Sequence, residues 1–353
     1  MGKIESLFKS TDLDCILVRK SSQDVNFSYF TKLPLDYFDN ALLVLKRNEK
    51  QIIFVSTLEY KWLAGNRNFD VSEVKKKEEF RKELKKEISC SKIGLNKDGL
   101  EYKTVGRFEH LFKNKSIVNI SKDIEKLREI KDKDEINCIK KAGDITSKAF
   151  RLVPELVKDK LTEKQAVLEL EYFMKKQGSE TLAFPPIVAS GKNAGIPHFI
   201  PSDKKIGNGF LMVDIGARYK NYCSDMSRTF FVGKPTKLDK KNYALVLEAK
   251  NSAESLLKEG ISARKVHITA EKILKKGNYA LVHALGHGLG LKGHDVPYRL
   301  NAKANFKLKE NMVLTIEPGI YDSKKGIRIE DVVLIKKKGF EYLGNFTREL
   351  SEI

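Results

Sequence analysis

Four carboxylates lie in two widely separated apolar stretches of this sequence. Asp214 and Asp225 belong to the first stretch, and Glu317 and Glu330 to the second, each beside Val, Ile, Leu or Met residues. Carboxylates that face each other among apolar side chains repel and lose hydration, so they are stable only when protonated or bound to cations. A single acidic hairpin is more often a solvated face of a sheet. Two hairpins of the same design favour a cation-binding site.

Each stretch has the pattern of a β-hairpin, in which a strand, a polar turn and a second strand follow one another. In a hairpin, the numbers of directly opposite residues have a constant sum. A turn centred on residues 219–220 therefore predicts that Asp214 lies opposite Asp225. The same rule applied to the second stretch predicts that Glu317 lies opposite Glu330. A longer loop would shift either pairing by a step.

Histidine is scarce in the chain, but three of its six histidines lie between residues 283 and 294. His287 is flanked by Gly286 and Gly288, which let neighbouring backbone approach closely. A lone histidine beside glycines is usually structural, whereas this density favours a functional site. Four carboxylates and one imidazole exceed the ligand set of one tetrahedral zinc ion, and their formal charge balances two divalent cations. The residues therefore predict a site for two metal ions.

Five residues, each in its local sequence context, resemble the metal ligands of the pita-bread metallopeptidases. This family contains methionine aminopeptidases, aminopeptidase P, prolidase and the metal-free creatinases. The residues are Asp214, Asp225, His287 in Gly-His-Gly-Leu-Gly, Glu317 in Thr-Ile-Glu-Pro-Gly and Glu330 in Arg-Ile-Glu-Asp. The resemblance covers residues 123–353 and implies that Asp225 and Glu330 bridge two divalent ions. Oxygen-rich ligands make Mn(II) the first expectation, with Co(II), Fe(II) and Zn(II) as alternatives.

The resemblance also implies roles for the residues around the metals. A hydroxide bridging the two ions would attack the peptide carbonyl, and Glu317 would move a proton as general base and then acid. His198, in Ile-Pro-His-Phe, and His294 would stabilise the tetrahedral intermediate or hold the substrate, and His283 would line the pocket. Arg328, two residues before the last carboxylate, would orient or screen that group, or form an ordinary surface ion pair. These three histidines and Arg328 form the expected substrate-binding set.

The substrate expectation depends on the N-terminal part of the chain. Residues 25–31 resemble the opening of the creatinase/prolidase N-terminal domain, which methionine aminopeptidases generally lack. The resemblance then implies an exopeptidase that cleaves Xaa-Pro bonds in small peptides with proline at the second position. Arg299, one position later than the arginine of similar archaeal prolidases, could hold the free carboxylate of a dipeptide, or the site could stay open to longer peptides.

Two other functions are compatible with the same fold. One is a related aminopeptidase that is not restricted to proline. The other is a non-enzymatic binding protein that uses its basic surface. Such relatives, like the metal-free creatinases, usually lack metal ligands, whereas all five ligand positions are filled here. The sequence therefore favours a metal-dependent hydrolase.

Composition limits the partners and the location of the protein. The 353 residues include 66 Lys and Arg against 47 Asp and Glu, a formal net charge of +19, which could attract nucleic acid. Because the lysines are spread along the chain without a nucleic-acid motif, we expect a solvated surface and no nucleic-acid partner. Four scattered cysteines, the lack of a signal peptide and the lack of a long apolar run predict a cytoplasmic protein without a membrane partner.

Residues 1–122 are expected to form an α/β domain of the creatinase/prolidase N-terminal type, because short apolar strands alternate with amphipathic helices. We expect strands at 15–18, 41–45, 51–55, 92–95 and 116–119, and helices at 58–63, 78–88 and 102–112. This part of the chain has no cluster of residues with metal-ligand spacing. No chemistry is expected there.

Residues 123–353 are expected to form an α+β catalytic domain of the pita-bread type. Apolar residues between 136 and 152 predict a long helix, and Thr162 with Gln165 forms a capping box for a second helix ending near Lys176. Two further helices, 241–259 and 263–276, precede the second hairpin. Helices followed by an acidic hairpin, occurring twice, predict an internal repeat with a pseudo-twofold axis through the metals. The resemblance adds a homodimer in which one N-terminal domain helps to close the partner's pocket.

Overall fold

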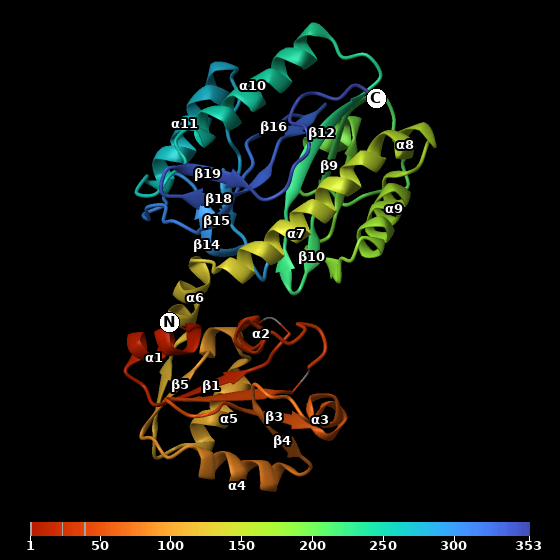
Figure 1. Ribbon diagram of the computed structural model, residues 1–353. Coiled ribbons are helices and arrows are strands. Elements are labelled where there is room, and N and C mark those ends of the chain that lie inside the picture. The colour runs from red at the N-terminus through yellow and green to blue at the C-terminus, as the bar shows by residue number, and fades with distance from the viewer. Residues whose placement is uncertain (1, 23, 39) are drawn as a thin grey trace. The chain divides into compact units, whose positions relative to one another are not determined.

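The computed structural model describes residues 2–22, 24–38 and 40–353 and divides into two compact units, Met1–Arg128 and Glu129–Ile353 (Figure 1). Helix α6 (Ser121–Glu129) spans this division. The domain boundary expected after residue 122 lies near the start of α6 and stays a prediction. Among the described residues, none of the helices has both the length and the apolar character needed to cross a membrane.

The first unit is built on one six-stranded sheet with the order β4-β3-β2-β1-β5-β6. Its strands are β1 (Cys15–Arg19), β2 (Leu42–Lys46), β3 (Ile52–Ser56), β4 (Asp70–Val74), β5 (Lys92–Leu95) and β6 (Ser116–Asn119). Its helices are α1 (Lys3–Thr11), α2 (Asn26–Thr31), α3 (Thr57–Leu63), α4 (Lys77–Glu87), the 3-10 turn η1 (Lys97–Gly99) and α5 (Tyr102–Leu111). β2 is antiparallel to both β1 and β3, and β4 is parallel to β3. The carboxyl ends of β1, β3 and β4 therefore share one edge of the sheet.

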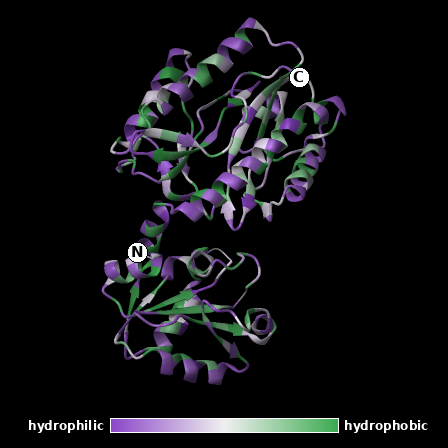
Figure 2. Ribbon diagram, in the orientation of Figure 1, coloured by the Kyte–Doolittle hydropathy of each residue, from purple (hydrophilic) through white to green (hydrophobic). Residues whose placement is uncertain are grey.

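Helices cover both faces of this sheet. Leu84 of α4 and Phe108 of α5 pack on Leu17, Val44 and Phe54 from three neighbouring strands. Figure 1 shows α1 and α2 on the face opposite α4, and Figure 2 shows that the strands between them are mainly hydrophobic. Burial on both faces explains why these strands are continuous apolar runs in the sequence.

Most elements of this unit were predicted to within one residue. All five expected strands and all three expected helices are present. Helices α1, α2 and α6, the 3-10 turn η1 and strand β4 were not predicted from the sequence. β4 is an edge strand that pairs only with β3, and its residues are at most half-buried, so its sequence carries no strong apolar signal. The buried aromatic run of α2 has no helical periodicity, because every residue in it is buried.

The second unit begins with helices packed on two small sheets. The helical elements are α7 (Lys133–Ala149), η2 (Phe150–Leu152), α8 (Val153–Lys158), α9 (Glu163–Lys176) and η3 (Gly191–Gly195). One sheet has the order β12-β9-β8 and the other β11-β10-β7. The strands are β7 (Thr181–Leu182), β8 (Ile187–Ser190), β9 (Gly209–Ile215), β10 (Ala217–Tyr219), β11 (Tyr222–Cys223) and β12 (Met226–Val232). As predicted, Thr162 and Gln165 form the capping box of α9.

The rest of the second unit contains α10 (Lys237–Glu254), α11 (Ala263–Lys276) and a five-stranded sheet with the order β14-β13-β15-β18-β19. The strands of this sheet are β13 (Gly286–Gly288), β14 (Asp295–Leu300), β15 (Val313–Ile316), β18 (Asp331–Lys336) and β19 (Gly339–Tyr342). A separate two-stranded sheet consists of β16 (Gly319–Tyr321) and β17 (Gly326–Arg328). The predicted helix 241–259 is wrong at both ends. A capping box of Thr236 and Asp239 starts α10 earlier, and the apolar residues after Glu254 belong to the following loop.

The same backbone contacts recur in both halves of this unit, which supports the predicted internal repeat. Before α9, the amide of Ile206 donates to the carbonyl of Leu161 at 3.0 Å. Before α11, the amide of Leu308 donates to the carbonyl of Ile261 at 2.8 Å. The two helix starts also form matching isolated bridges, Thr162 with Lys205 and Ser262 with Lys307. Each half therefore has a helix anchored in the same way beside an acidic hairpin.

The register of the first hairpin differs from the prediction. Lys220 and Asn221 both have positive φ, 47° and 70°, as in a two-residue type I′ turn, so the turn is centred one position later than expected. Asp214 consequently lies opposite Ser227 and not opposite Asp225. Asparagine tolerates a positive φ better than most residues, which favours this later turn. Asp225 lies two positions before Ser227, so the two carboxylates are diagonal neighbours.

The register of the second hairpin agrees with the prediction. Ile316 lies opposite Asp331, and Gly319 lies opposite Arg328. The residue numbers of both pairs add up to the same value as 317 and 330. Glu317 and Glu330 therefore occupy opposite positions of the hairpin, as predicted.

A buried ionic network ties the second hairpin to its surroundings. The carboxylate of Asp331 contacts Arg228 Nη2 at 2.7 Å, Lys250 Nζ at 3.1 Å and Arg348 Nε at 2.8 Å. The Asp331, Arg228 and Lys250 side chains are at most 2% exposed. Burial alone would raise the pKa of Asp331, but the three cations outweigh burial and lower that pKa to about 2.

The same cations hold backbone beside two of the acidic positions. Lys250 Nζ donates to the carbonyl of Ile316 at 3.0 Å, next to Glu317 in the chain, and Arg228 Nη1 donates to the carbonyl of Glu330. The network therefore fixes the ends of β15 and β18, from which both carboxylates project.

We expect Asp331→Asn to lower the free energy of unfolding of the second unit by roughly 3–5 kcal/mol, because it leaves the buried Arg228 without its counter-ion, whereas Lys250 keeps Glu254 at 2.8 Å. Hydrogen exchange of peptides covering β15 and β18 measures this unit alone. The matched control is Asp203→Asn, which removes an exposed ion pair with Lys164 and should cost about 1 kcal/mol or less. Equal effects of the two substitutions would contradict a stabilising role for the network.

Candidate active site

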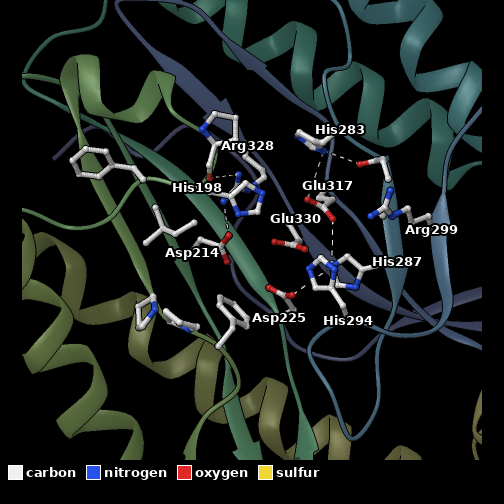
Figure 3. A pocket seen from close by; sticks show the side chains of 18 of the residues that line it. His198, Asp214, Asp225, His283, His287, His294, Arg299, Glu317, Arg328 and Glu330 are labelled. Atoms are coloured by element: carbon white, nitrogen blue, oxygen red, sulfur yellow. Dashed lines mark hydrogen bonds and ion pairs between the residues drawn. The ribbon is translucent and has the colours of Figure 1, made fainter. Parts of the chain in front are cut away.

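One cavity of about 560 Å³ in the second unit brings all the sequence-predicted site residues together. Figure 3 shows their side chains projecting from separate strands and loops toward the same space. The predicted residues that line the cavity are His198, Asp214, Asp225, His283, His287, His294, Glu317, Arg328 and Glu330. They come from both halves of the internal repeat.

His287 lies on β13, between β14 and β15 in the five-stranded sheet. Its glycine neighbours are required by this position. A Cβ at Gly286 would lie 1.9 Å from the carbonyl oxygen of Thr315, and one at Gly288 would lie 2.3 Å from that of Val296. His287 Nδ1 is 3.0 Å from the carbonyl oxygen of Gly288, so Nδ1 carries the proton and Nε2 is free to act as a ligand. Burial lowers the pKa of His287 to about 3, which keeps the ring neutral.

The carboxylates converge on this imidazole. His287 Nε2 is 3.4 Å from Glu317 Oε1 and 3.7 Å from Asp225 Oδ2. Asp225, His287 and Glu330 can each direct a ligand atom to within 4.8 Å of the other two, and all three side chains are buried. Two hydroxyls hold the acids in place: Ser227 donates to Glu330 at 2.7 Å, and Thr315 to Glu317 at 3.3 Å.

Arg328 contacts a different carboxylate from the one expected. Its guanidinium donates to Asp214 Oδ2 and to Ser227 Oγ, and not directly to Glu330. It also donates to the carbonyl of Pro197 at 3.2 Å and to the hydroxyl of Tyr321 at 3.0 Å. Arg328 is therefore a buried crosslink between the first acid and the loop that carries His198, and the alternative of a surface ion pair is wrong.

The electrostatics of the cavity are unfavourable without a bound cation. Burial raises the pKa of Asp225 well above its ordinary value, and the carboxylates of Glu330 and Asp214 raise it further. Burial and the neighbouring acids also raise the pKa of Glu330. For Glu317, burial raises the pKa to about 7 although Arg328 opposes this. The single arginine in this cluster does not offset the repulsion among the four acids, three of which are buried.

The residues fit a site for divalent cations. Asp214 Oδ1 is buried and has no hydrogen-bond partner, so a ligand position is open beside Arg328. Carboxylate oxygens with one neutral imidazole are a donor set that suits Mn(II), Fe(II), Co(II) or Zn(II). A cation among these groups would remove the repulsion that raises the pKa of the acids.

The other histidines surround this cluster. His283 is held within the protein, because Nε2 lies 3.0 Å from Tyr321 Oη and Nδ1 lies 2.7 Å from the carbonyl oxygen of Ala284. His294 stacks on His287 with ring centroids 3.8 Å apart. His198 and His294 are both exposed, so they can meet a molecule entering the cavity. His198 follows the short loop element η3, on the segment fixed by Arg328.

Three site residues were missed in the sequence. Ser227 and Thr315 each lie two positions from a predicted carboxylate, and the period of a β-strand could have identified them. Tyr321 contacts both His283 and Arg328. No sequence signal distinguishes it, because an aromatic residue in a strand is usually part of the core.

Comparisons with known proteins agree with this arrangement. The model of metallopeptidase family M24 matches residues 137–337, and the model of the creatinase/prolidase N-terminal domain matches residues 1–130. An uncharacterised peptidase of Methanocaldococcus jannaschii is 38% identical over 359 residues, which cover 99% of this chain and 97% of the relative. An Xaa-Pro dipeptidase of Pyrococcus furiosus is 35% identical and is aligned over 99% of both chains.

Solved structures share the same fold. The crystal structure of an X-Pro aminopeptidase from Thermotoga maritima superposes with a TM-score of 0.88 at 30% sequence identity, covering 98% of this chain and 99% of that one. The match spans both domains. The chain belongs to metallopeptidase family M24, and its pita-bread catalytic domain follows a creatinase/prolidase N-terminal domain.

Proposed function

We propose that this enzyme is an exopeptidase that hydrolyses the bond before proline in small peptides. The observation that carries the proposal is the cavity lined by four carboxylates, in which Glu317 and Asp225 lie 3.4 and 3.7 Å from the free Nε2 of His287. The proline preference is supported by end-to-end similarity to proteins named Xaa-Pro dipeptidase and X-Pro aminopeptidase. An Xaa-Pro bond needs a dedicated enzyme because its nitrogen is tertiary and the ring restricts the backbone.

The metal-dependent peptidases of family M24 use a pair of divalent metal ions. We propose that Asp214, Asp225, His287, Glu317 and Glu330 hold them here, with Asp225 and Glu330 shared between the two ions. The oxygen-rich donor set makes Mn(II) the first candidate, followed by Co(II), Fe(II) and Zn(II). When bound, the two ions would lower the pKa of a water molecule and polarise the scissile carbonyl.

The protein's own groups then position the substrate and move the proton. Glu317 accepts the proton of the attacking water on a carboxylate oxygen and delivers it to the proline nitrogen as the C–N bond breaks. His198 and His294, exposed at the cavity, would hydrogen-bond the oxygen of the tetrahedral intermediate. His283 and Arg328, which share the hydroxyl of Tyr321, keep the substrate side of the cavity in place.

Arg299 is the proposed determinant of substrate length. It lines the cavity from β14 and is exposed, so its guanidinium can bind the free carboxylate of a dipeptide. We propose a dipeptidase that retains some activity on longer peptides. Aminopeptidase activity without a proline requirement is the second candidate. A non-enzymatic binding role has less support, because the cavity contains the complete set of acids and the imidazole.

The proposal extends to assembly and location. Tyr37 is 77% exposed, and Leu58 and Trp62, one turn apart on α3, are 90% and 62% exposed. Exposed apolar groups of this kind mark protein contacts, and we propose that they lie at a homodimer interface. A monomer in sedimentation equilibrium would contradict this.

We propose a cytoplasmic location. The four free cysteines suit a reducing compartment, and cell fractionation tests the location.

We expect Ala-Pro to be hydrolysed in the presence of Mn(II), with little turnover of Ala-Ala. Glu317→Gln should lower kcat by roughly 10²–10⁴-fold, because it removes the group that transfers the proton. The control is Glu169→Gln, an exposed position on α9. Metal content is measured in parallel, since Glu317 is also a proposed ligand. Inactivity of the metal-loaded protein on every proline peptide would refute the substrate proposal, and binding of RNA instead would favour the binding-protein alternative.

We expect Mn(II) to raise the thermal midpoint of the metal-depleted protein. A ligand at a hundred times its Kd stabilises the folded state by about 2.7 kcal/mol. Asp225→Asn should abolish this gain without lowering the midpoint of the metal-free protein, because it removes one of the mutually repelling charges. Asp203→Asn, at an exposed surface position, should respond to Mn(II) like the wild type. A full response of Asp225→Asn to the metal would show that the ions bind elsewhere.

We expect Arg299→Ala to raise KM for Ala-Pro more than for Ala-Pro-Ala amide, because only the dipeptide presents its carboxylate at this position. Loss of one charge-assisted hydrogen bond corresponds to roughly a tenfold change or more. Lys303→Ala, an exposed position just after β14, is the control for a general loss of positive charge. An equal rise in KM for both substrates would assign carboxylate recognition to another residue.

A further inference from the structure

The N-terminal domain contains a second cavity, of about 390 Å³, which shares no lining residue with the catalytic cavity. It lies at the edge of the sheet where three parallel strands end. Arg19 is the last residue of β1, Ser56 of β3 and Val74 of β4, and all three line the cavity. Residues of α4 and α5 form its other walls. Small ligands of α/β proteins bind in the crevice outside the carboxyl ends of such strands.

Every charged side chain in the described lining of this cavity is cationic. The described lining includes six cations and no carboxylate: Arg19, Lys75, Lys76, Lys77, Arg81 and Arg107. We call it the basic cavity. Lys75 and Lys76 form exposed ion pairs with Glu73 and Glu79, at 3.3 and 3.9 Å, and neither acid lines the cavity. Within the part of the chain that the structure describes, the side chains of Lys77, Arg81 and Arg107 have no ion-pair or hydrogen-bond partner.

Arg19 is held at the wall of the basic cavity by uncharged groups. Its Nη1 donates to the carbonyl of Ala41 at 2.9 Å, and its Nη2 donates to Asn40 Oδ1 at 2.7 Å. Burial lowers the pKa of Arg19, and the nearby positive charge of Arg107 lowers it further. Among the described residues, no acid offsets the repulsion between these two arginines, so both would gain from a bound anion.

Three aromatic side chains also line the basic cavity. Phe54 and Phe80 lie edge to face with ring centroids 5.4 Å apart, and Phe108 lines the cavity beside them. A free inorganic anion would contact only the cationic wall. A ligand that contacts both the cationic and the aromatic side chains needs an anionic group joined to a flat apolar ring. The planar guanidinium of arginine can donate two parallel hydrogen bonds to the oxygens of a phosphate group. A lysine ammonium acts only as a point charge, so the arginines favour phosphate as the anion.

We propose that the basic cavity binds a small phosphorylated compound with a flat ring, the chemistry of a mononucleotide. Arg19, Arg81 and Arg107 would hold the phosphate, and the ring would lie against Phe80 and Phe108. The described lining includes no histidine, cysteine or carboxylate, so the cavity is suited to binding and not to acid-base or metal chemistry. The volume is in the usual range for small-molecule sites. This inference is independent of the proposed peptidase function.

Isothermal titration of the full-length, metal-loaded protein with ADP at physiological salt tests the proposal. We expect saturable binding at one site, with adenosine and inorganic phosphate each weaker by roughly tenfold or more, because each supplies only one of the two contacts. The double variant Arg81→Gln/Arg107→Gln should weaken ADP binding roughly tenfold or more. Phe80→Leu should weaken ADP binding without changing the affinity for phosphate.

The matched control is Arg67→Gln, which removes one charge from an exposed position of the same domain outside the cavity and should leave ADP affinity unchanged. Circular dichroism and thermal midpoints verify that each variant is folded. ADP binding that survives in the double variant would place the ligand elsewhere, for example on the catalytic metals, and would overturn the proposal. Absence of ADP binding, or binding of single-stranded RNA alone, would also overturn it.

Discussion

Mutual repulsion among Asp214, Asp225, Glu317 and Glu330 is the constraint that shapes the catalytic domain. The acids are gathered in a buried cavity, and burial itself raises the pKa of three of them. Strands and hydroxyl groups hold them in this unfavourable arrangement, so the folding energy of the surrounding domain offsets the cost. The cavity is thereby organised for cations before any cation binds, which is the electrostatic preorganisation on which metal-assisted catalysis depends.

The layers around the cavity alternate in charge. Arg228 and Lys250 lie behind the acids and hold backbone carbonyls at Glu330 and Ile316. Asp331 lies between these cations and balances them. The charges of this network therefore compensate one another, whereas among the four acids Arg328 pairs with Asp214 alone and negative charge remains open to a ligand. The functional site is therefore the region in which buried negative charge lacks a full set of cationic partners.

The sequence predicted the chemistry of the site better than its detailed geometry. The types, order and contexts of the five candidate ligands identified the cavity, and the turn of the second hairpin fixed the register of Glu317 and Glu330. The register of the first hairpin was missed by one turn position, because positive φ values at Lys220 and Asn221 are a local preference that apolar patterning does not reveal. The partner of Arg328 could not be predicted, since Asp214 comes from the other half of the repeat. Net charge was equally uninformative, because a total of +19 hides an acidic cavity in one domain and a basic one in the other.

The internal repeat distributes the five proposed metal ligands unevenly. Asp214 and Asp225 belong to the first half, and His287, Glu317 and Glu330 to the second. Neither half alone holds enough donor atoms for two cations, although each has its own helices and acidic hairpin. Division of the gene at Gly233, between β12 and α10, would yield two fragments of similar design, neither of which is an enzyme. Catalysis in this domain therefore depends on the interface between its two halves.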